Sequence, residues 1–99
     1  MRVLAVDWRC RLGQIDLIAE DGETLVIVEV KTRRGLGFGS PQEAVDLRKQ
    51  RKLRQLAEVY RQQAGRRADA VRIDVIGVLL NAQLRVVHCD HLRDAVQDQ

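Results

Sequence analysis

Residues 13–33, GQIDLIAEDGETLVIVEVKTR, contain two apolar-rich runs on either side of an Asp-Gly pair. Asp-Gly between such runs is a strong signal of a two-residue β-hairpin turn, because both residues tolerate a positive φ. The second run, residues 25–31, is almost wholly apolar and β-branched, which is typical of a central strand covered on both faces. This stretch therefore predicts a hairpin inside a sheet.

Four polar residues interrupt the apolar pattern of this predicted hairpin. If the Asp-Gly pair forms the whole loop, Gln14 lies opposite Glu29. Because side chains alternate faces along a strand, Gln14 and Asp16 then share one face with Glu29 and Lys31. A buried carboxylate is costly unless it is paired or binds a metal. The cluster is therefore either a Glu29–Lys31 ion pair beside Asp16 or a functional site.

The same residue types have a defined chemistry if the cluster is functional. Asp16 and Glu29 provide the hard oxygen ligands that Mg²⁺ or Mn²⁺ takes, and the carbonyl of Val30 is a candidate third ligand. The metal would polarise a phosphodiester and lower the pKa of a bound water. Lys31 would orient that water or stabilise the charge on the phosphate. We therefore expect Asp16, Glu29 and Lys31 to be catalytic, and Asp16, Glu29 and Val30 to hold the metal.

Positive charge is concentrated in one contiguous part of the chain. The formal net charge is +3, but residues 31–67 hold eleven Lys/Arg against three acids, a local net charge of +8. Such a field suits a polyanion such as nucleic acid, although a Lys/Arg-rich helix face is often only solvated. The candidate nucleic-acid-binding residues are Arg33, Arg34, Arg48, Lys49 and Lys52.

A loop and a helix are predicted after the hairpin. Residues 33–39, RRGLGFG, form either a connector or a loop that follows phosphates. Ser40, Pro41 and a capping box predict a helix over residues 40–64. Its expected apolar stripe is Val45, Leu53, Leu56, Ala57, Tyr60 and Ala64. Lys49 falls within this stripe, and its amine either reaches water or points at the carboxylate cluster.

The remaining segments predict strands around this unit. Residues 2–11 and 70–80 read as strands, the second with Arg72 and Asp74 on one face. Residues 84–89 should pair with it as an antiparallel hairpin, and Asp90 is expected to cap a short helix over residues 92–96. The run HCDH at 88–91 has metal-binding residue types, but alternating strand directions and the lack of a partner pair argue against a joint zinc-type site.

Length and composition predict one domain, residues 1–99. Hydrophobic residues make up 45% and charged residues 31%, as in ordinary globular proteins. No apolar run approaches the roughly 20 residues of a membrane span, and no signal peptide is visible. The two cysteines form no CxxC pair. We therefore expect a cytoplasmic protein with no membrane partner.

The motifs together resemble a known group of proteins. Asp16, then Glu29-Val30-Lys31, then a basic loop and helix, resemble the PD-(D/E)xK nuclease core of restriction endonucleases and archaeal Holliday-junction resolvases. The ordered blocks WRCRLGQIDLIAEDGETLVIVEVKTR, FGSPQEAV, Lys49 and VRIDVIGV are similar to the bacterial YraN family of that superfamily. This resemblance implies an α/β fold with a restriction-endonuclease-like mixed β-sheet flanked by helices, and metal-dependent action on nucleic acid.

Two features depart from the family pattern. Gln14 stands where the family usually has a glutamate, and an amide cannot supply an anionic ligand. The family normally begins with an extra helix that carries a glutamate, whereas this sequence begins at or just before its first strand. We expect the absence of that helix to uncover apolar sheet surface, which would favour a homodimer or another partner.

Three functions are compatible with these observations. The first is an endonuclease, dependent on Mg²⁺ or Mn²⁺, that cleaves phosphodiester bonds in branched or otherwise structured DNA. The second is a nucleic-acid-binding protein of the same fold that has lost catalysis. The third is a structural or partner-binding protein whose polar cluster is an ion-pair network.

Overall fold

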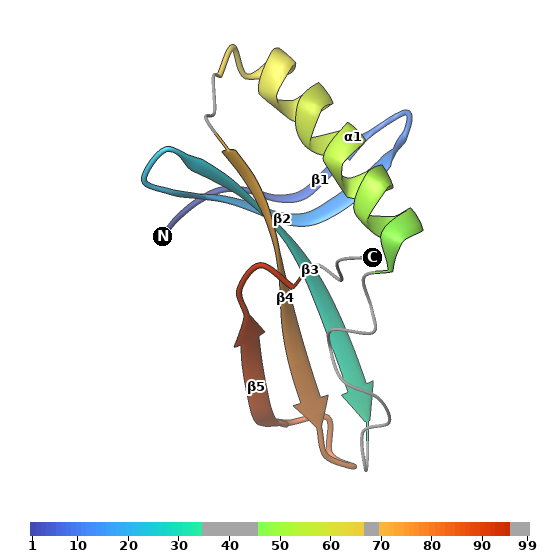
Figure 1. Cartoon of the computed structure of the whole chain (residues 1–99). Helices are drawn as coiled ribbons and strands as arrows, with labels where there is room; N and C mark the ends of the chain where they lie inside the picture. The colour runs from blue at the N-terminus through green and yellow to red at the C-terminus, as the bar shows by residue number, and fades with distance from the viewer. Residues whose placement is uncertain (35–45, 67–69, 96–99) are drawn as a thin grey trace.

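The computed structural model describes residues 1–34, 46–66 and 70–95, which form one mixed sheet and one helix. The elements in order are β1 (Arg2–Cys10), β2 (Gly13–Asp21), β3 (Thr24–Arg34), α1 (Leu47–Gln63), β4 (Ala70–Leu80) and β5 (Val86–Leu92). The strand order is β1-β2-β3-β4-β5; β3 and β4 are parallel and the other neighbours are antiparallel (Figure 1). The predicted mixed α/β sheet is confirmed, with one helix in the described residues.

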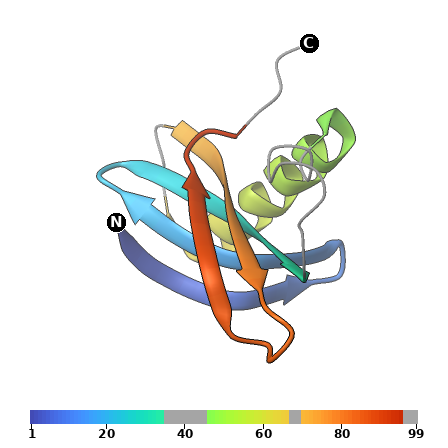
Figure 2. The same cartoon turned by 90° about the horizontal axis from the view of Figure 1, so that it is seen from below.

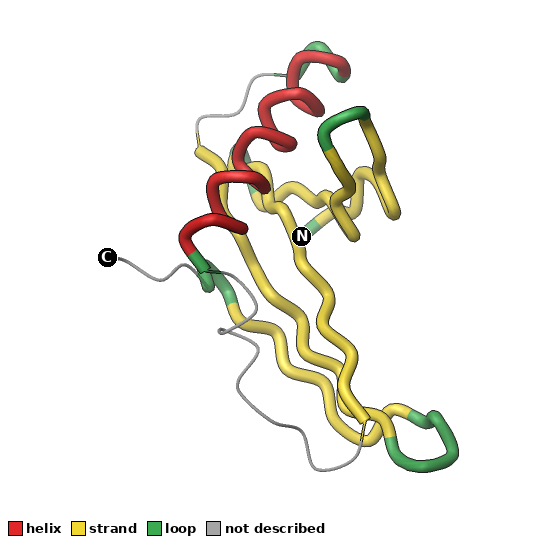
Figure 3. Tube along the Cα trace, turned by 90° about the vertical axis from the view of Figure 1, so that its right-hand side faces the viewer, coloured by secondary structure: helices red, strands yellow, loops and turns green. Residues whose placement is uncertain are grey.

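α1 covers one face of the sheet because parallel strands need a crossover between them. Seen from below, the helix lies to one side of the strands (Figure 2). The main core between helix and sheet includes Leu53, Leu56, Ala57, Ile18, Ile27 and Ile73. The C-terminal parts of β3 and β4, with β5, extend beyond the helix (Figure 3). This geometry places the N-terminal end of α1 over the middle of the long strands.

β3 is the buried central strand that its apolar sequence predicts. Leu25, Val26, Ile27 and Val28 have no exposed surface, so both faces of the strand are covered over this stretch. Leu25 and Ile27 belong to the core under α1, and Val26 and Val28 belong to a smaller cluster on the opposite face. The continuous run of β-branched and apolar residues is explained by burial on both sides.

The hairpin register differs from the prediction by two residues. Asp21 pairs with Thr24, so the turn consists of Gly22 and Glu23 and not of the Asp-Gly pair. Gly22 has a φ of +60°, and glycine in the first loop position is the signature of a type II′ turn. The ladder runs to the Leu17–Val28 pair, and Gln14 pairs with Arg9 of β1. The predicted pairing of Gln14 with Glu29 is therefore wrong.

α1 begins later than its predicted start. Asp46 is the N-cap: its backbone is extended (φ −79°, ψ 179°), and its carboxylate accepts a hydrogen bond of 2.9 Å from the Lys49 backbone N–H. An uninterrupted helix over residues 40–64 is therefore wrong, because the chain is extended at Asp46. The predicted cap at Ser40 and Pro41 lies outside the described residues. The C-terminal stop is confirmed, since Gly65 follows the helix with a φ of +62°.

The apolar stripe of α1 is partly as predicted. Leu53, Leu56 and Ala57 are buried, and Tyr60 packs against the core with its ring edge-on to a tryptophan in β1. Ala64 is exposed and lies beyond the end of the helix. The buried position that the stripe omitted is Gln50, which is 8% exposed. Val45 lies outside the described residues.

The described C-terminal part of the chain has no helix where one was expected: Leu92 ends β5, and residues 93 and 94 form a turn. β4 has the predicted bounds, and β5 pairs antiparallel with it. Asp90 pairs with Gly77 inside β5, and the Ala95 backbone N–H donates to the Ile73 carbonyl at 2.8 Å, which continues this side of the sheet. The predicted helix capped by Asp90 is therefore wrong over residues 92–95; its last predicted residue is not among those described.

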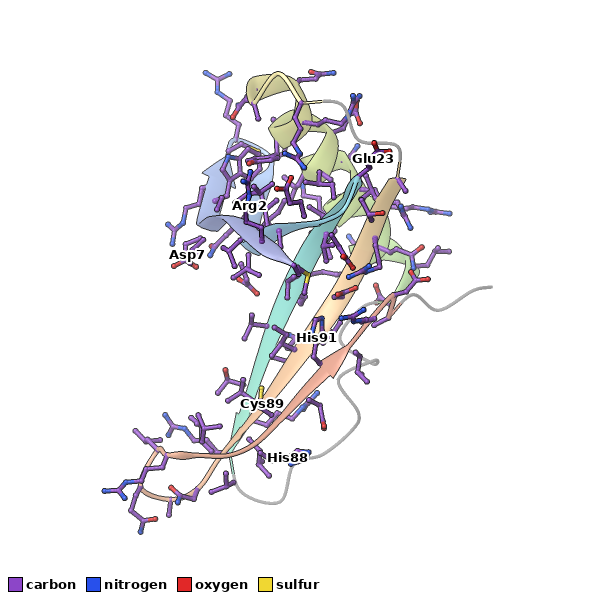
Figure 4. The ribbon with its side chains drawn as sticks, turned by 90° about the vertical axis from the view of Figure 1, so that its left-hand side faces the viewer. Arg2, Asp7, Glu23, His88, Cys89 and His91 are labelled. Atoms are coloured by element: carbon purple, nitrogen blue, oxygen red, sulfur yellow. The ribbon has the colours of Figure 1, made fainter. Side chains whose placement is uncertain are left out.

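Histidines of β5 take part in separate pairs. His88 lies 3.0 Å from Asp90, whereas His91 Nε2 lies 2.7 Å from Asp74 Oδ2. The two rings lie apart along the strand (Figure 4). Within residues 1–34, 46–66 and 70–95, no group of three or more His, Cys, Asp or Glu side chains could hold a metal ion. The described chain also contains no helix with the length and apolar character needed to cross a membrane.

Asp74 is the fully buried carboxylate on the sheet face opposite α1. Arg72 Nε donates to Oδ1 at 2.9 Å, and the Asp94 backbone N–H donates to the same oxygen at 2.9 Å. Burial by itself would raise the pKa of Asp74, but hydrogen bonds from Arg72, the Asp94 N–H and His91 outweigh it and hold the pKa below its ordinary value. Arg72 also donates to Asp21 at 3.1 Å, so the network joins the β2–β3 turn to β4 and β5.

Replacing this buried carboxylate should destabilise the fold. We expect Asp74→Asn to lower the free energy of unfolding at pH 7 by about 3 kcal/mol, because Arg72 then lacks one of its charged partners. Chemical denaturation measures this change. The matched control is Asp90→Asn, which removes the aspartate of an exposed Asp–His pair in β5 and should change stability by less than about 0.5 kcal/mol. Equal effects of the two substitutions would contradict the assignment.

The same site should make stability depend on acid. The folded-state pKa of Asp74 lies below its ordinary value of 3.8, so its ionised form stabilises the fold above pH 3.8. That contribution is lost as the pH falls below 3.8 through the lower folded-state pKa. Unfolding measured from pH 5 to pH 2 should therefore be less steeply pH-dependent in Asp74→Asn than in the wild type.

Candidate metal and nucleic-acid site

The candidate site lies where β3 loses one of its two neighbours. The β2–β3 ladder runs to the Leu17–Val28 pair, whereas the β3–β4 ladder continues to Arg34 and Leu80. Glu29 and Lys31 follow Ile27 on alternate residues and therefore share its face, which is the face covered by α1. The polar part of β3 is thus presented to the N-terminal end of the helix.

Asp16 of β2 makes a side-chain hydrogen bond to β3 just beyond the end of the β2–β3 ladder. Its Oδ2 accepts a hydrogen bond of 2.8 Å from the Val30 backbone N–H. The side chain takes the place of a backbone carbonyl of β2, so it keeps the two strands together beyond their last pair. The sequence prediction that Asp16 lies beside the Glu29-Val30-Lys31 segment is supported by this contact. The expected register is wrong, but a shift of two residues preserves the alternation of faces.

Glu29 is paired across to the helix and not along its own strand. The residue is only 8% exposed, and its Oε1 lies 3.3 Å from Lys49 Nζ. Of the two interpretations of Lys49, the structure has the amine directed at the carboxylate cluster. Lys31 forms no ion pair with the described residues, so the alternative in which Glu29 pairs with Lys31 is not what the structure has. Lys31 lies in register with Gly77 of β4 and is partly exposed.

Basic residues of α1 gather along an open hollow on the helix. The described residues that line it are Asp46, Arg48, Lys49, Arg51, Lys52, Arg54, Gln55 and Glu58. Five of these are basic and two are acidic, so the hollow carries a net positive charge. It contains the three α1 residues predicted to bind nucleic acid, and Arg51 and Arg54 join them although the sequence suggested only solvated positions. Lys49 is notable because it both lines the hollow and pairs with Glu29.

Arg33 and Arg34 lie on a different element from the helix set. They are the last two residues of β3, and Arg34 lies five residues beyond Glu29. A strand rises about 3.3 Å per residue, which places Arg34 roughly 17 Å along the strand from Glu29. Arg34 is exposed, whereas Arg33 is partly buried and its Nε has no hydrogen-bond partner among the described residues. The predicted basic residues therefore divide into a helix set and a strand-end pair.

Gln50 is a polar residue of this region that sequence reasoning missed. It is 8% exposed, and within the part of the chain that the structure describes its Nε2 has no hydrogen-bond partner. It lies between Lys49 of the ion pair and the core residue Leu53 on the buried side of α1. The helical period counted from Leu53 and Ala57 would have placed it inward, but its polarity argued for the surface.

The two carboxylates of the site have the chemistry of a magnesium ligand set. Asp16 uses Oδ2 for Val30 and Glu29 uses Oε1 for Lys49, so each retains one oxygen with no bond to the described residues. Mg²⁺ usually keeps several waters and binds one or two protein carboxylates together with substrate phosphates. The donor set therefore fits such an ion. Gln14 is exposed and paired with Arg9, so its amide does not occupy a place beside Glu29.

Comparison with known proteins identifies the family. The family model described as "Uncharacterised protein family UPF0102" matches residues 1–78. The chain belongs to the UPF0102 family. This confirms the YraN-like family predicted from the sequence, and the matched segment includes Asp16, Glu29, Lys31 and Lys49.

Relatives in the UPF0102 family match nearly the whole chain. A UPF0102 protein of Rhodococcus jostii is 46% identical over 95 residues, which are 96% of this chain and 80% of the relative. A UPF0102 protein of Nocardia farcinica is 46% identical over 93 residues, or 94% of this chain and 72% of the relative. One from Moorella thermoacetica is 43% identical over 94 residues, or 95% and 78% of the two chains. These similarities establish the family and name no function for it.

A double-mutant cycle should separate the observed partner of Glu29 from the predicted one. We expect Glu29→Gln combined with Lys49→Gln to show a coupling energy of about 1–2 kcal/mol in unfolding, because the pair is partly exposed. The cycle of Glu29→Gln with Lys31→Gln should give less than about 0.5 kcal/mol. A larger coupling to Lys31 than to Lys49 would contradict the structure.

Proposed function

We propose that this UPF0102 protein is a divalent-metal-dependent endonuclease that cleaves phosphodiester bonds in structured DNA. The observation that carries the proposal is the Glu29–Lys49 pair beside a positively charged hollow, with Asp16 bound to the backbone N–H of the adjacent Val30. A carboxylate as buried as that of Glu29 is costly in a sheet, and it lies with its partly exposed partner Lys49 at the edge of the core, where solvent and substrate can reach it. A restriction-endonuclease-like fold of the PD-(D/E)xK type is part of the same proposal.

Asp16, Glu29 and the Val30 carbonyl are the groups that would hold Mg²⁺ or Mn²⁺. The ion would supply Lewis acidity toward the phosphodiester and a bound water of lowered pKa. Lys31 lies two residues beyond Glu29 on the same face and carries no ion pair in the described chain, so its ammonium is available to the phosphate. Asp16 also fixes the backbone of Val30, which positions the strand that bears both charged side chains.

The distribution of positive charge supports a polymeric substrate. The helix set and the strand-end pair of arginines lie on two elements, and Arg34 is roughly 17 Å from Glu29 along β3. A charged surface of this extent suits several consecutive phosphates better than one mononucleotide. The preference for branched DNA rests on the resemblance to Holliday-junction resolvases. The helix that normally precedes this core in the family would add a further acidic ligand, and a homodimer could present two sites to one junction.

A cleavage assay tests the proposal. With Mg²⁺ or Mn²⁺, four-way junction, flap and linear DNA substrates should be nicked by the wild type, with the branched forms cut fastest. Glu29→Gln and Lys31→Met should each reduce the rate at least about 100-fold, because each removes a group that contacts the reacting phosphate or its metal. Glu23→Gln, in the exposed β2–β3 turn (Figure 4), is the matched control and should cleave as the wild type does.

The outcomes of this assay distinguish the three functions. Cleavage that persists unchanged in Glu29→Gln and Lys31→Met would overturn the nuclease assignment to this site. Salt-dependent binding without cleavage would indicate a nucleic-acid-binding protein of the same family. Failure to bind DNA or RNA at low salt would leave a structural or partner-binding role.

The basic hollow should contribute to affinity in a salt-dependent way. We expect Arg48→Gln with Lys52→Gln to weaken DNA binding about tenfold and to reduce the slope of log affinity against log salt by about 2, one for each lost phosphate contact. Fluorescence anisotropy over a salt series measures both. Arg85→Gln, in the turn before β5 and away from the hollow, is the control; it removes one charge where the double variant removes two, so the effects are compared per charge removed. An equal effect of the control would show that DNA is attracted by the overall positive charge and does not bind along the hollow.

A further inference from the structure

The ion pair between Lys49 and Glu29 is asymmetric in its exposure. The Glu29 side chain is 10% exposed and that of Lys49 is 42% exposed, with 3.3 Å between Nζ and Oε1. The buried carboxylate therefore depends on the ammonium for neutralisation, whereas the ammonium can reach solvent. A flexible four-carbon stem lets a lysine move its charge by several bond rotations. Of the two residues, Lys49 is therefore the one whose charged group can move out of the ion pair.

The position of Lys49 in α1 is held independently of its side chain. Asp46 caps the helix through the Lys49 backbone N–H, so the Cα of Lys49 is fixed at the first turn. This turn contains Arg48 and Lys49 and no acidic residue. Cations at a helix N-terminus oppose the helix dipole, so helix stability does not account for them. The structure places two carboxylates at this end of α1, those of Asp46 and Glu29, and Glu29 is the one that pairs with the Lys49 ammonium.

Charged groups from three elements lie along the Glu29-Val30-Lys31 segment. β2 contributes Asp16, whose Oδ2 is committed to Val30; β3 contributes Lys31 on the same face; and α1 contributes Lys49. A divalent cation bound to Glu29 and Asp16 would lie within a few ångströms of the Lys49 ammonium. Like charges at such separations repel strongly in a partly buried site. Glu29 therefore cannot bind the Lys49 ammonium and the divalent cation at the same time with the affinity it has for each alone.

We propose that Lys49 and the divalent cation compete for Glu29, so that binding of the metal releases the Lys49 ammonium to the phosphates of nucleic acid in the α1 hollow. This inference rests on the metal site of the proposed function. Lys49 already lines the hollow, so its release requires rotation of the side chain and no movement of the helix. Metal and nucleic acid then bind with positive coupling, and linkage makes this coupling reciprocal.

Metal affinity in the absence of nucleic acid tests the competition. Mn²⁺ binding, measured by electron paramagnetic resonance and calorimetry, should be about tenfold tighter in Lys49→Gln than in the wild type, because a neutral donor replaces a competing charge. Lys49→Arg keeps the charge and should bind Mn²⁺ as the wild type does. Arg61→Gln removes a charge from the other end of the same helix, where Arg61 pairs with Glu58, and should also leave the affinity unchanged.

Failure of this inference is distinguishable from failure of the proposed function. If Mn²⁺ binds the wild type and Lys49→Gln with equal affinity, the competition is overturned and the metal site stands. If neither protein binds Mn²⁺, the metal site itself is wrong. Circular dichroism and thermal unfolding confirm that each variant is folded before binding is measured.

A measurement on the unaltered protein covers the case in which Lys49→Gln does not fold. In ¹⁵N-lysine-labelled wild type, the ammonium signal of Lys49 should be protected from exchange by its ion pair and should lose that protection as Mg²⁺ is added. Lys52 provides the internal control. Protection of Lys49 that persists at saturating Mg²⁺ would overturn the release of the ammonium.

Coupling to DNA gives a second readout. Ca²⁺, used as a cation that permits binding without cleavage, should raise the affinity of the wild type for a labelled DNA junction about fivefold or more. The same increase should be smaller in Lys49→Gln, because that variant has no ammonium to release. An equal increase in both proteins would overturn the proposed coupling through Lys49.

Discussion

The structure depends on the change of neighbours that β3 makes half-way along its length. Up to Val28 the strand pairs with β2 on one side and β4 on the other, and its side chains are buried on both faces. Beyond Val28 the β4 pairing continues while the β2 pairing ends, and Asp16 supplies a side-chain acceptor for Val30 in its place. The transition from an apolar to a polar strand coincides with this change. The N-terminal end of α1 lies over the same point, so the cluster is a direct product of the sheet topology.

Two buried carboxylates, Asp74 and Glu29, lie on opposite faces of the sheet. They differ in the number of their partners, and this difference distinguishes a structural carboxylate from one that can bind a ligand. Asp74 has no exposed surface and is surrounded by Arg72, His91 and the Asp94 N–H, and these bonds lower its pKa. Such a saturated group joins distant segments and offers no oxygen to a ligand. In residues 1–34, 46–66 and 70–95, Glu29 has one ion-pair partner, a lysine that is itself nearly half exposed. A carboxylate satisfied by a single mobile cation can exchange that cation for another.

Much of the fold follows from local patterns, and the errors have identifiable causes. Residues 25–31 and 70–80 form the predicted central strands because continuous β-branched runs need burial on both faces. The turn was displaced by one residue, which shifts the pairing register by two, because Gly22 can occupy either position of a two-residue loop, and pairing along the whole hairpin decides between them. Asp46 caps α1 within a segment whose sequence also permits an earlier start. Asp90 is a good cap in isolation, yet pairing of β5 with β4 requires an extended chain there.

By itself the sequence determined the family, the mixed sheet and the presence of Asp16, Glu29 and Lys31 along one short segment, because these follow from residue order and from the alternation of side chains in strands. The tertiary structure decided which groups meet. Lys49 is distant in sequence from Glu29, and no local pattern specifies that a helix after a long connection will direct one amine onto one carboxylate. The same holds for Asp74 and His91, which come together through the β4–β5 pairing. Partner choice across elements depends on packing of the whole core, and packing is a property of the folded chain as a unit.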